Sequence, residues 1–216
     1  FRKTIRYFWG LYLAMGILFI FIFFLIARGA MGFMPTLDDL EKTETILASQ
    51  VISDDDKVLG TFFSENRTFV SYENLPPHLV HALLATEDIR FFRHSGIDLR
   101  GLLRVMKGIL TGNTRSGGGS TISQQLAKML FPREDFSGPV QLILRKFKEW
   151  IIAIKLERSY TKEEIMTMYL NKYDFLNLAV GIKTAANVYF NCEPESLQLH
   201  QAAMLVGMAK NSALYN

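Results

Sequence analysis

An uncharged run of 21 residues near the N-terminus, from Tyr7 to Ala27, constrains this chain more than any other feature. Most of its side chains are apolar, and a helix of that length, rising about 1.5 Å per residue, would cross the hydrocarbon layer of a bilayer. A cleaved signal peptide would have a shorter apolar region and a clear small-residue cleavage site, whereas Ala27 and Ala30 offer only a weak one. The run therefore predicts a transmembrane helix inside an anchor of residues 1–30.

Basic residues on either side of the run predict its orientation. Arg2, Lys3 and Arg6 precede it, and only Arg28 follows closely. Because the more basic flank of a transmembrane helix stays in the cytoplasm, residues 31–216 are expected on the outer side of the membrane. An exported domain also makes nucleic acid an unsuitable partner.

The net charge of +3 is distributed unevenly along the chain. Residues 31–86 hold three basic and nine acidic groups, whereas residues 90–162 hold fourteen basic and five acidic groups. This basic excess indicates an anionic partner, and a solvated helix surface is the alternative. The single cysteine, Cys192, excludes a disulfide framework and a cysteine-rich metal site.

Hydrophobic periodicity and turn residues divide the exported part into two regions. Residues 31–75 are expected to form a polar stalk and a short β-hairpin or three-stranded patch, and residues 76–216 a mainly helical domain. The expected strands are Gln50–Ser53, Val58–Phe63 and Thr68–Tyr72. The first expected helix is opened by Pro76 and Pro77, and the next three are Leu99–Leu110, Ser120–Leu130 and Val140–Glu157. Another runs from a capping box of Thr161 and Glu164 to Asn171, and the last is capped by Ser196.

Two adjacent carboxylates, Glu87 and Asp88, end the first of these helices and are followed by aromatic residues and His94. A carboxylate in such surroundings is a candidate general acid or base. The alternative is a solvated helix end in which Asp88 caps the next turn. Nearby, His78 and His81 lack both the spacing and the third ligand of a zinc site, so they are interpreted as surface or partly buried histidines.

A glycine-rich segment, Gly117–Gly119, precedes Ser120 and Thr121 at an expected helix start. Backbone N–H groups at a helix N-terminus can bind an anion, and the two hydroxyls can join them. The segment is not a nucleotide-binding loop, because glycines occupy the positions where Lys and Ser or Thr are required. A flexible linker is the alternative. Polar side chains follow directly, at Gln124, Gln125 and Lys128.

A third cluster, Arg145, Lys146 and Glu149, falls within about a quarter of the circumference of one helix. Two cations beside a carboxylate could bind a phosphate group while the carboxylate orients them. The alternative is a salt bridge between Arg145 and Glu149, which lie four residues apart.

In this order the motifs closely resemble one family, the peptidoglycan glycosyltransferases, which occur as the membrane-proximal domain of class A penicillin-binding proteins and as monofunctional enzymes. The matching residues are Glu87, Asp88, Phe91, His94 and Gly96 in the first motif; Gly118, Gly119, Ser120, Thr121, Gln124, Gln125, Leu126 and Lys128 in the second; Arg145, Lys146 and Glu149 in the third; and Tyr169, Leu170, Asn171 and Gly181 in the fourth. The alanine-rich stretch near residues 197–210 resembles the fifth motif. One departure is that Leu176 and Leu178 stand where the fourth motif usually has glycines.

The resemblance implies a mainly α, lysozyme-like glycosyltransferase domain with a small jaw subdomain that dips into the outer leaflet of the bacterial inner membrane. The apolar stretches Leu102–Leu110 and Met129–Pro132 are the candidates for that jaw. The implied partners are lipid II, the growing glycan strand and the membrane, with a transpeptidase domain expected to follow this chain. No cofactor is expected to be required, although a divalent Mg or Mn ion is possible.

The resemblance also implies a role for each motif residue. Glu87 would act as general base on the 4-hydroxyl of the acceptor GlcNAc, which attacks C1 of the donor MurNAc with inversion while undecaprenyl pyrophosphate leaves. Glu149, the second catalytic residue, would orient the cations or a divalent metal. The substrate-binding residues would be Asp88, Phe91 and His94 beside Glu87; Gly119, Ser120, Thr121, Gln124 and Gln125 on the sugars or phosphate; and Lys128, Arg145, Lys146 and Lys155 on the pyrophosphate.

Two other functions are compatible with the same residues. A membrane-bound lytic muramidase would use Glu87 as a general acid in a lysozyme-like fold. A non-catalytic anchor for wall-synthesis partners would need neither Glu87 nor Glu149. The basic stretch and the glycine-rich segment argue against the muramidase, which has no pyrophosphate to bind.

Overall fold

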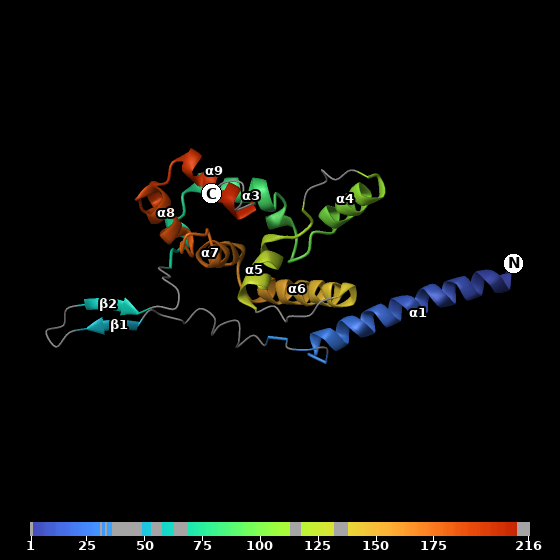
Figure 1. The fold of residues 1–216 in the computed structure, drawn as a ribbon. Helices are drawn as coiled ribbons and strands as arrows, with labels where there is room; N and C mark the ends of the chain where they lie inside the picture. The colour runs from blue at the N-terminus through green and yellow to red at the C-terminus, as the bar shows by residue number, and fades with distance from the viewer. Residues whose placement is uncertain are drawn as a thin grey trace.

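The computed structural model describes residues 2–30, 32, 34–35, 49–52, 58–62, 69–112, 118–131 and 138–210. Its first element, helix α1 (Arg2–Ala27), extends away from the rest of the chain (Figure 1). Within the described residues, α1 is the one helix long and apolar enough to cross a membrane. The predicted apolar helix is therefore confirmed.

The expected β-hairpin is also present. Strands β1 (Ser49–Ile52) and β2 (Val58–Phe62) pair antiparallel, with Ser49 opposite Phe62 and a register irregularity between Val51 and Ile52. The hairpin lies on the side of the helical domain opposite to that from which α1 extends (Figure 1).

The third expected strand, Thr68–Tyr72, is wrong over the residues that the structure describes there. The backbone of Val70 does form two hydrogen bonds, but both join it to the side-chain amide of Asn171 instead of a neighbouring strand (N–H to Oδ1 2.9 Å, Nδ2 to carbonyl 2.8 Å). Tyr72 then begins the 3-10 helix η1 (Tyr72–Asn74). Asn171 thus ties this segment to α7 across 101 residues of chain.

Seven helices and two short 3-10 turns follow in the described part of the domain. They are α3 (Pro77–Glu87), η2 (Phe91–Arg93), α4 (Leu99–Leu110), α5 (Ile122–Leu130), α6 (Pro139–Ser159), α7 (Lys162–Lys172), α8 (Ile182–Phe190), η3 (Pro194–Ser196) and α9 (Leu199–Lys210). The predicted helices agree closely with these bounds up to α7. The mainly α fold class is confirmed.

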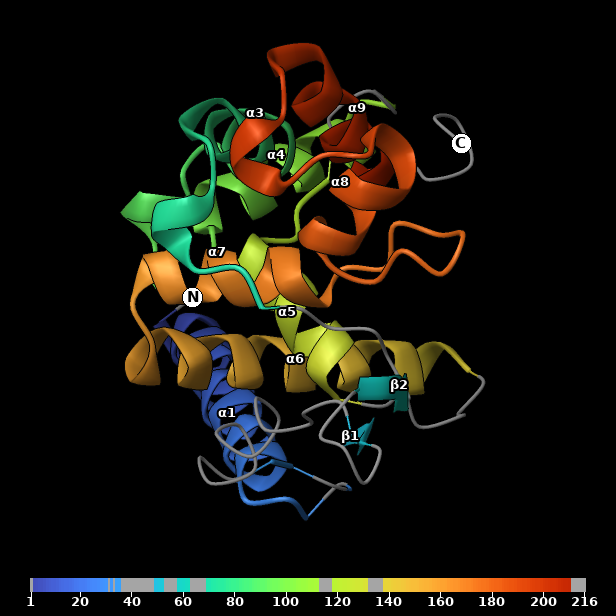
Figure 2. The same ribbon diagram turned by 90° about the vertical axis from the view of Figure 1, so that its left-hand side faces the viewer.

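Helix α7 forms the centre of this domain. All residues from Ile165 to Leu170 are buried, and a helix that is buried on every side must lie inside a core. It contacts α5, α6 and α8, so it is surrounded by other helices of the domain (Figure 2). The predicted capping box is present at its start, where Thr161 and Glu164 satisfy each other's backbone N–H groups.

Two predictions near the C-terminal end are corrected. Ser196 does not cap the last helix, because it belongs to η3, and the N–H of Gln198 is instead satisfied by Oε1 of Gln201 (2.8 Å). Helix α8 was not expected. It begins at Ile182, directly after Gly181, and it buries Ala185 and Ala186.

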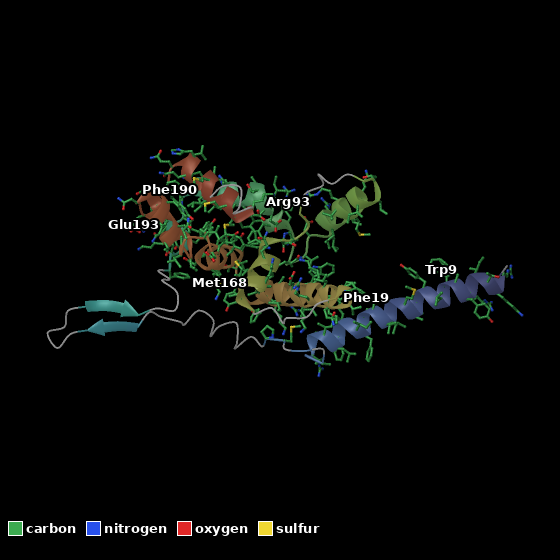
Figure 3. The ribbon with its side chains drawn as sticks, in the orientation of Figure 1. Trp9, Phe19, Arg93, Met168, Phe190 and Glu193 are labelled. Carbon is green, nitrogen blue, oxygen red and sulfur yellow. The ribbon has the colours of Figure 1, made fainter. Side chains whose placement is uncertain are left out.

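Helix α6 connects the domain to α1. The ring of Phe147 packs against Phe19 and Phe23 of α1, with ring centroids 5.7 and 5.3 Å apart, and also contacts Trp150 (5.6 Å). Figure 3 shows Phe19 at this contact and Trp9 much farther out along α1. The last two turns of α1 therefore run beside α6.

The jaw candidates have different environments. Leu102–Leu110 lies in α4, which stands apart from the core (Figure 1) and buries only Gly101 and Gly108. Its exposed apolar side chains are Leu99, Leu103, Met106, Ile109 and Leu110. In the second candidate stretch, Met129, Leu130 and Phe131 pack against the core, and Pro132 lies outside the described residues. A further group of exposed apolar side chains, Val140, Leu142 and Ile143, lies at the start of α6, outside both candidate stretches.

Candidate active site

Glu87, the last residue of α3, has one fixed and one available carboxylate oxygen. Its Oε2 accepts a hydrogen bond from Nε2 of Gln125 (2.7 Å), and Oε1 of Gln125 accepts one from the hydroxyl of Tyr169 (3.2 Å). Oε1 of Glu87 is buried and has no hydrogen-bond partner among the residues that the structure describes. A buried acceptor without a partner is costly unless a ligand satisfies it.

The hydroxyl of Tyr169 is a permanent donor. Burial, and then the nearby negative charge of Glu87, raise the pKa of Tyr169 far above its ordinary value. The same two causes raise the pKa of Tyr173. Because Tyr169 stays protonated, it donates to the amide oxygen of Gln125 and leaves the amide NH2 facing Glu87. Gln125, expected on substrate, is thus a residue that orients Glu87.

Asp88 links the carboxylate pair to two other elements. Nε2 of His94 lies 3.1 and 3.0 Å from the two oxygens of Asp88, and the backbone N–H of Ile122 donates to Oδ2 (3.2 Å). Both side chains are largely buried. Asp88 therefore places a negative charge at the N-terminus of α5, where the helix dipole favours it, and it holds His94 in one orientation.

The segment after η2 is held at Gly96. The carbonyl of Gly96 accepts from Oγ1 of Thr121 (2.7 Å) and from Nε2 of Gln124 (3.1 Å). Gly96 has φ +90°, and a Cβ there would lie 2.9 Å from the backbone carbon of Ala153. Glycine is therefore required for both conformation and space.

These contacts place three of the expected substrate-binding residues in supporting positions. Thr121 and Gln124 are 1% exposed and committed to Gly96, and Phe91 is 0% exposed in the core. Phe91 and Gln124 are absent from the lining of the cleft beside Glu87, and Thr121 lines it with a hydroxyl that is already bonded to Gly96. They support the segment between Asp88 and Gly96, which follows Glu87 directly, so their effect on catalysis would pass through that segment.

An open cleft of about 290 Å³ lies beside Glu87. Its lining comes from the end of α3, the start of α4 and the segment before α5: Glu87, Asp88, Ile89, Arg90, Asp98, Gly101, Arg104, Gly118, Gly119, Ser120 and Thr121. Gly119 packs against α4, since a Cβ there would lie 3.2 Å from Val105. The glycine-rich segment and the carboxylate thus border one space.

The expected cations are in part brought to this cleft. Nζ of Lys146 donates to Oγ of Ser120 (3.0 Å) and to Oε2 of Glu149 (2.7 Å). Glu149 therefore pairs with Lys146 and not, as the alternative had it, with Arg145, which is half-buried on the same helix. Lys128 is exposed on α5, which packs against α6.

Lys155 has a different environment from the other expected cations. Its Nζ donates to the carbonyl of Pro35 (2.8 Å), just beyond α1, and burial lowers its pKa. This contact joins the segment just after α1 to α6. The structure therefore does not bring Lys155 together with Lys146 and Ser120.

Residues 55–216 match the model of the transglycosylase family. The chain belongs to this family. Three curated relatives are each 34% identical to it over 183 residues: the penicillin-binding proteins 1A of Neisseria lactamica, Pseudomonas aeruginosa and Escherichia coli K12. The match covers 85% of this chain and 22%, 22% and 21% of those relatives, so the chain spans about a fifth of their length. The resemblance to the transglycosylase domain of class A penicillin-binding proteins is confirmed, and the transpeptidase domain stays a prediction.

Other site residues of this transglycosylase domain were missed in the sequence. Arg90 and Asp98 form an ion pair at the cleft, with Nε of Arg90 3.0 Å from Oδ2 of Asp98. The hydrogen bond that Arg90 donates to Asp98 raises the pKa of Arg90. Burial would raise the pKa of Asp98, but the hydrogen bond and charge of Arg90 outweigh it and hold that pKa below its ordinary value. Tyr169 stands in the fourth motif, yet the motif itself does not indicate that its hydroxyl reaches Gln125.

Among the residues that the structure describes, no set of side chains fits a divalent metal ion held by the protein alone. The described residues contain no group of three or more His, Cys, Asp or Glu side chains that could hold one. Glu149, expected to orient the cations or a divalent metal, is paired with Lys146.

Proposed function

We propose that this domain polymerises lipid II into peptidoglycan glycan strands by inverting glycosyl transfer, with Glu87 as the general base. The supporting observation is the second oxygen of Glu87, a buried acceptor without a partner among the described residues, in a carboxylate whose other oxygen is fixed by Gln125. A hydroxyl that enters the cleft can satisfy that oxygen and lose its proton to it.

In this reaction the 4-hydroxyl of the acceptor GlcNAc gives its proton to Oε1 of Glu87. The acceptor oxygen forms a bond to C1 of the donor MurNAc, and the bond from C1 to the pyrophosphate oxygen breaks. Undecaprenyl pyrophosphate leaves with the electron pair. Gln125, itself held by Tyr169, keeps the carboxylate of Glu87 in one orientation. The base is therefore preorganised and need not reorient during the reaction.

Negative charge develops on the departing pyrophosphate, so cations near the cleft stabilise the transition state. Lys146 is held beside Ser120 by Glu149, which supports a role for Glu149 in orienting that ammonium group. Arg145 and Lys128, on α6 and α5, are the further cations of this proposal. Thr121 and Gln124 act through the backbone of Gly96.

A lipid-linked substrate requires that the cleft lie close to the membrane. Three apolar surfaces support this: α1, the exposed face of α4, and the start of α6, where Val140, Leu142 and Ile143 are exposed. We propose that α4 and the start of α6 enter the outer leaflet of the bacterial inner membrane. The basic residues before α1 favour the outward orientation of the domain.

Replacing Glu87 with Gln tests the assignment, because it keeps the shape of the side chain and removes the base. Polymerisation of labelled lipid II in detergent, with products resolved by gel, should slow by about 10²–10⁴-fold. Glu163→Gln changes an exposed glutamate of α7 and serves as the matched control, with unchanged rate. A near-normal rate in the Glu87→Gln variant would exclude Glu87 as the base.

A further inference from the structure

Lys162 occupies a position that helix energetics disfavour. It is the first residue of α7, where the partial positive charge of the helix N-terminus repels a cation, and the residues beside it, Glu163 and Glu164, are acidic as expected there. Its side chain is nevertheless only 20% exposed. A cation that lies at a helix N-terminus and is largely shielded from solvent must be stabilised by contacts with other parts of the fold.

The reason lies in three contacts of its ammonium group. Nζ of Lys162 donates to the carbonyl of His94 (2.7 Å), forms an ion pair with Glu157 (2.7 Å) and lies 4.2 Å from the ring centroid of Phe91. Two of these contacts are with the segment that follows Glu87. A hydrogen bond with a charged donor is stronger than one between neutral groups. A cation above the face of an aromatic ring is attracted to that ring.

Glu157 in turn fixes Lys162. Its side chain is 4% exposed, and its Oε1 accepts hydrogen bonds from Oγ of Ser123 (2.5 Å) and from Nζ of Lys162 (2.7 Å). A buried carboxylate must be paired, and here its partners come from α5 and α7. Ser123, Glu157 and Lys162 therefore join α5, α6 and α7 to one another next to the segment of residues 88–96.

The backbone that Lys162 holds leads back to the base. His94, whose carbonyl binds Lys162, binds Asp88 through its imidazole, and Asp88 adjoins Glu87. We propose that Lys162 and Glu157 form a clamp that positions Glu87 by fixing the segment 88–96 from its inner side. This inference rests on the proposed function, and neither residue touches the substrate.

The test compares Lys162→Met with Lys162→Arg in the full chain. Met keeps the length and removes the charge, so kcat for lipid II polymerisation should fall by about tenfold or more while KM stays within about twofold. Arg keeps the charge and should recover part of the lost kcat. A rise in KM with unchanged kcat, or an unchanged kcat in the Met variant, would overturn the proposal.

A second variant covers the case in which Lys162→Met fails to fold because Glu157 is left buried and unpaired. Glu157→Gln combined with Lys162→Met removes both charges and keeps an acceptor for Ser123. This double variant should fold and show the same loss of kcat. Thr161→Ala is the control for destabilisation, since it breaks the capping box of α7 without touching the segment 88–96, and its kcat should equal that of the wild type.

Hydrogen–deuterium exchange measures the clamp without relying on activity. Amides within residues 88–96 should exchange about tenfold faster in the double variant than in the wild type, and at the wild-type rate in Thr161→Ala. Unchanged exchange in the double variant would overturn the clamp even if the enzyme polymerises lipid II. Faster exchange in a chain whose wild type does not polymerise lipid II would support the clamp and contradict the proposed function instead.

Discussion

Three consecutive residues, Leu176, Asn177 and Leu178, have left-handed backbone conformations with φ of 66°, 50° and 64°. Asparagine tolerates this region, but leucine does not, and each leucine there costs about 1 kcal/mol or more. The turn is held by its surroundings: the N–H of Leu176 donates to Asp174 (2.9 Å), and the carbonyl of Phe175 accepts from the hydroxyl of Tyr189 (2.7 Å). The glycines usual in this motif would remove the strain.

Leu178→Gly should therefore stabilise the protein. The side chain is 93% exposed, so its removal loses almost no packing, and relief of strain should exceed the entropic cost of glycine by about 0.5 kcal/mol. The measurement is the midpoint of thermal unfolding in detergent, which should rise. Leu178→Ala removes the same side chain but keeps Cβ, so its midpoint should not rise. Equal stabilisation by both changes would show that strain is not the cause.

At the residue scale, the sequence predicted which side chains gather at the cleft better than it predicted what each one does. Glu87, Ser120 and Lys146 were recognisable because each belongs to a motif of residues that are close together in the sequence. The contacts of Gln125 with Glu87, and of Lys162 with His94, join residues 38 and 68 positions apart. No spacing rule reaches that far, so Gln125 was expected on substrate and Lys162 had no expected role.

At the element scale, α4 depends on the connection between Arg90 and Asp98. Asp98 is the N-cap residue of α4, and Arg90 lies in the turn after α3, so their ion pair joins the amphipathic α4 to the segment that follows the proposed base. The pair lines the cleft. It therefore helps to hold the start of α4 beside the segment that follows Glu87.

Asp98→Asn should destabilise the protein in a pH-dependent way. The pKa of Asp98 is lower in the folded state than its ordinary value of 3.8, so its stabilising effect is present above pH 3.8 and is lost as the pH falls through the lower folded value. Near pH 7 the variant should lose roughly 1 kcal/mol of unfolding free energy, and below about pH 3.8 its curve should approach that of the wild type.

The measurement is the unfolding midpoint of both proteins between pH 2.5 and 7, a range of roughly one unit below to three units above the ordinary aspartate pKa. Glu195→Gln, an exposed carboxylate of η3, is the control and should match the wild type throughout. A deficit in Asp98→Asn that stayed constant down to the acid end would mean that the charge of Asp98 contributes nothing.

Element prediction was accurate where a helix carries one strong local signal, and it failed where no such signal is present. Helices α4 and α7 have an amphipathic repeat and a capping box, respectively. Helix α8 contains Thr, Asn, Val, Tyr and Phe, which are weak helix formers, and it is stabilised by the packing of Ala185 and Ala186 against the core. The segment near Val70 has strand-like residues, but its hydrogen-bonding partner is a side chain, which no local pattern reveals.

At the scale of the whole molecule, apolar surface and chemistry face the same way. Figure 1 shows α4 and α6 on the side of the domain from which α1 extends, and α6 carries both kinds of residue. Phe147 packs against α1, whereas Lys146 donates hydrogen bonds to Glu149 and to Ser120, which lines the cleft. One helix thus connects the anchor to the cations, which fits an enzyme whose substrate has its lipid in the membrane and its sugars outside.

The same arrangement would suit an enzyme that cuts glycan strands with one carboxylate, so the direction of the reaction is the central claim. The direct measurement incubates the purified full chain separately with labelled lipid II and with mature peptidoglycan, and resolves the products of each. The proposal predicts glycan strands and released undecaprenyl pyrophosphate from lipid II, and no soluble fragments from peptidoglycan. Muropeptides released from peptidoglycan, or lipid II left unreacted, would contradict it.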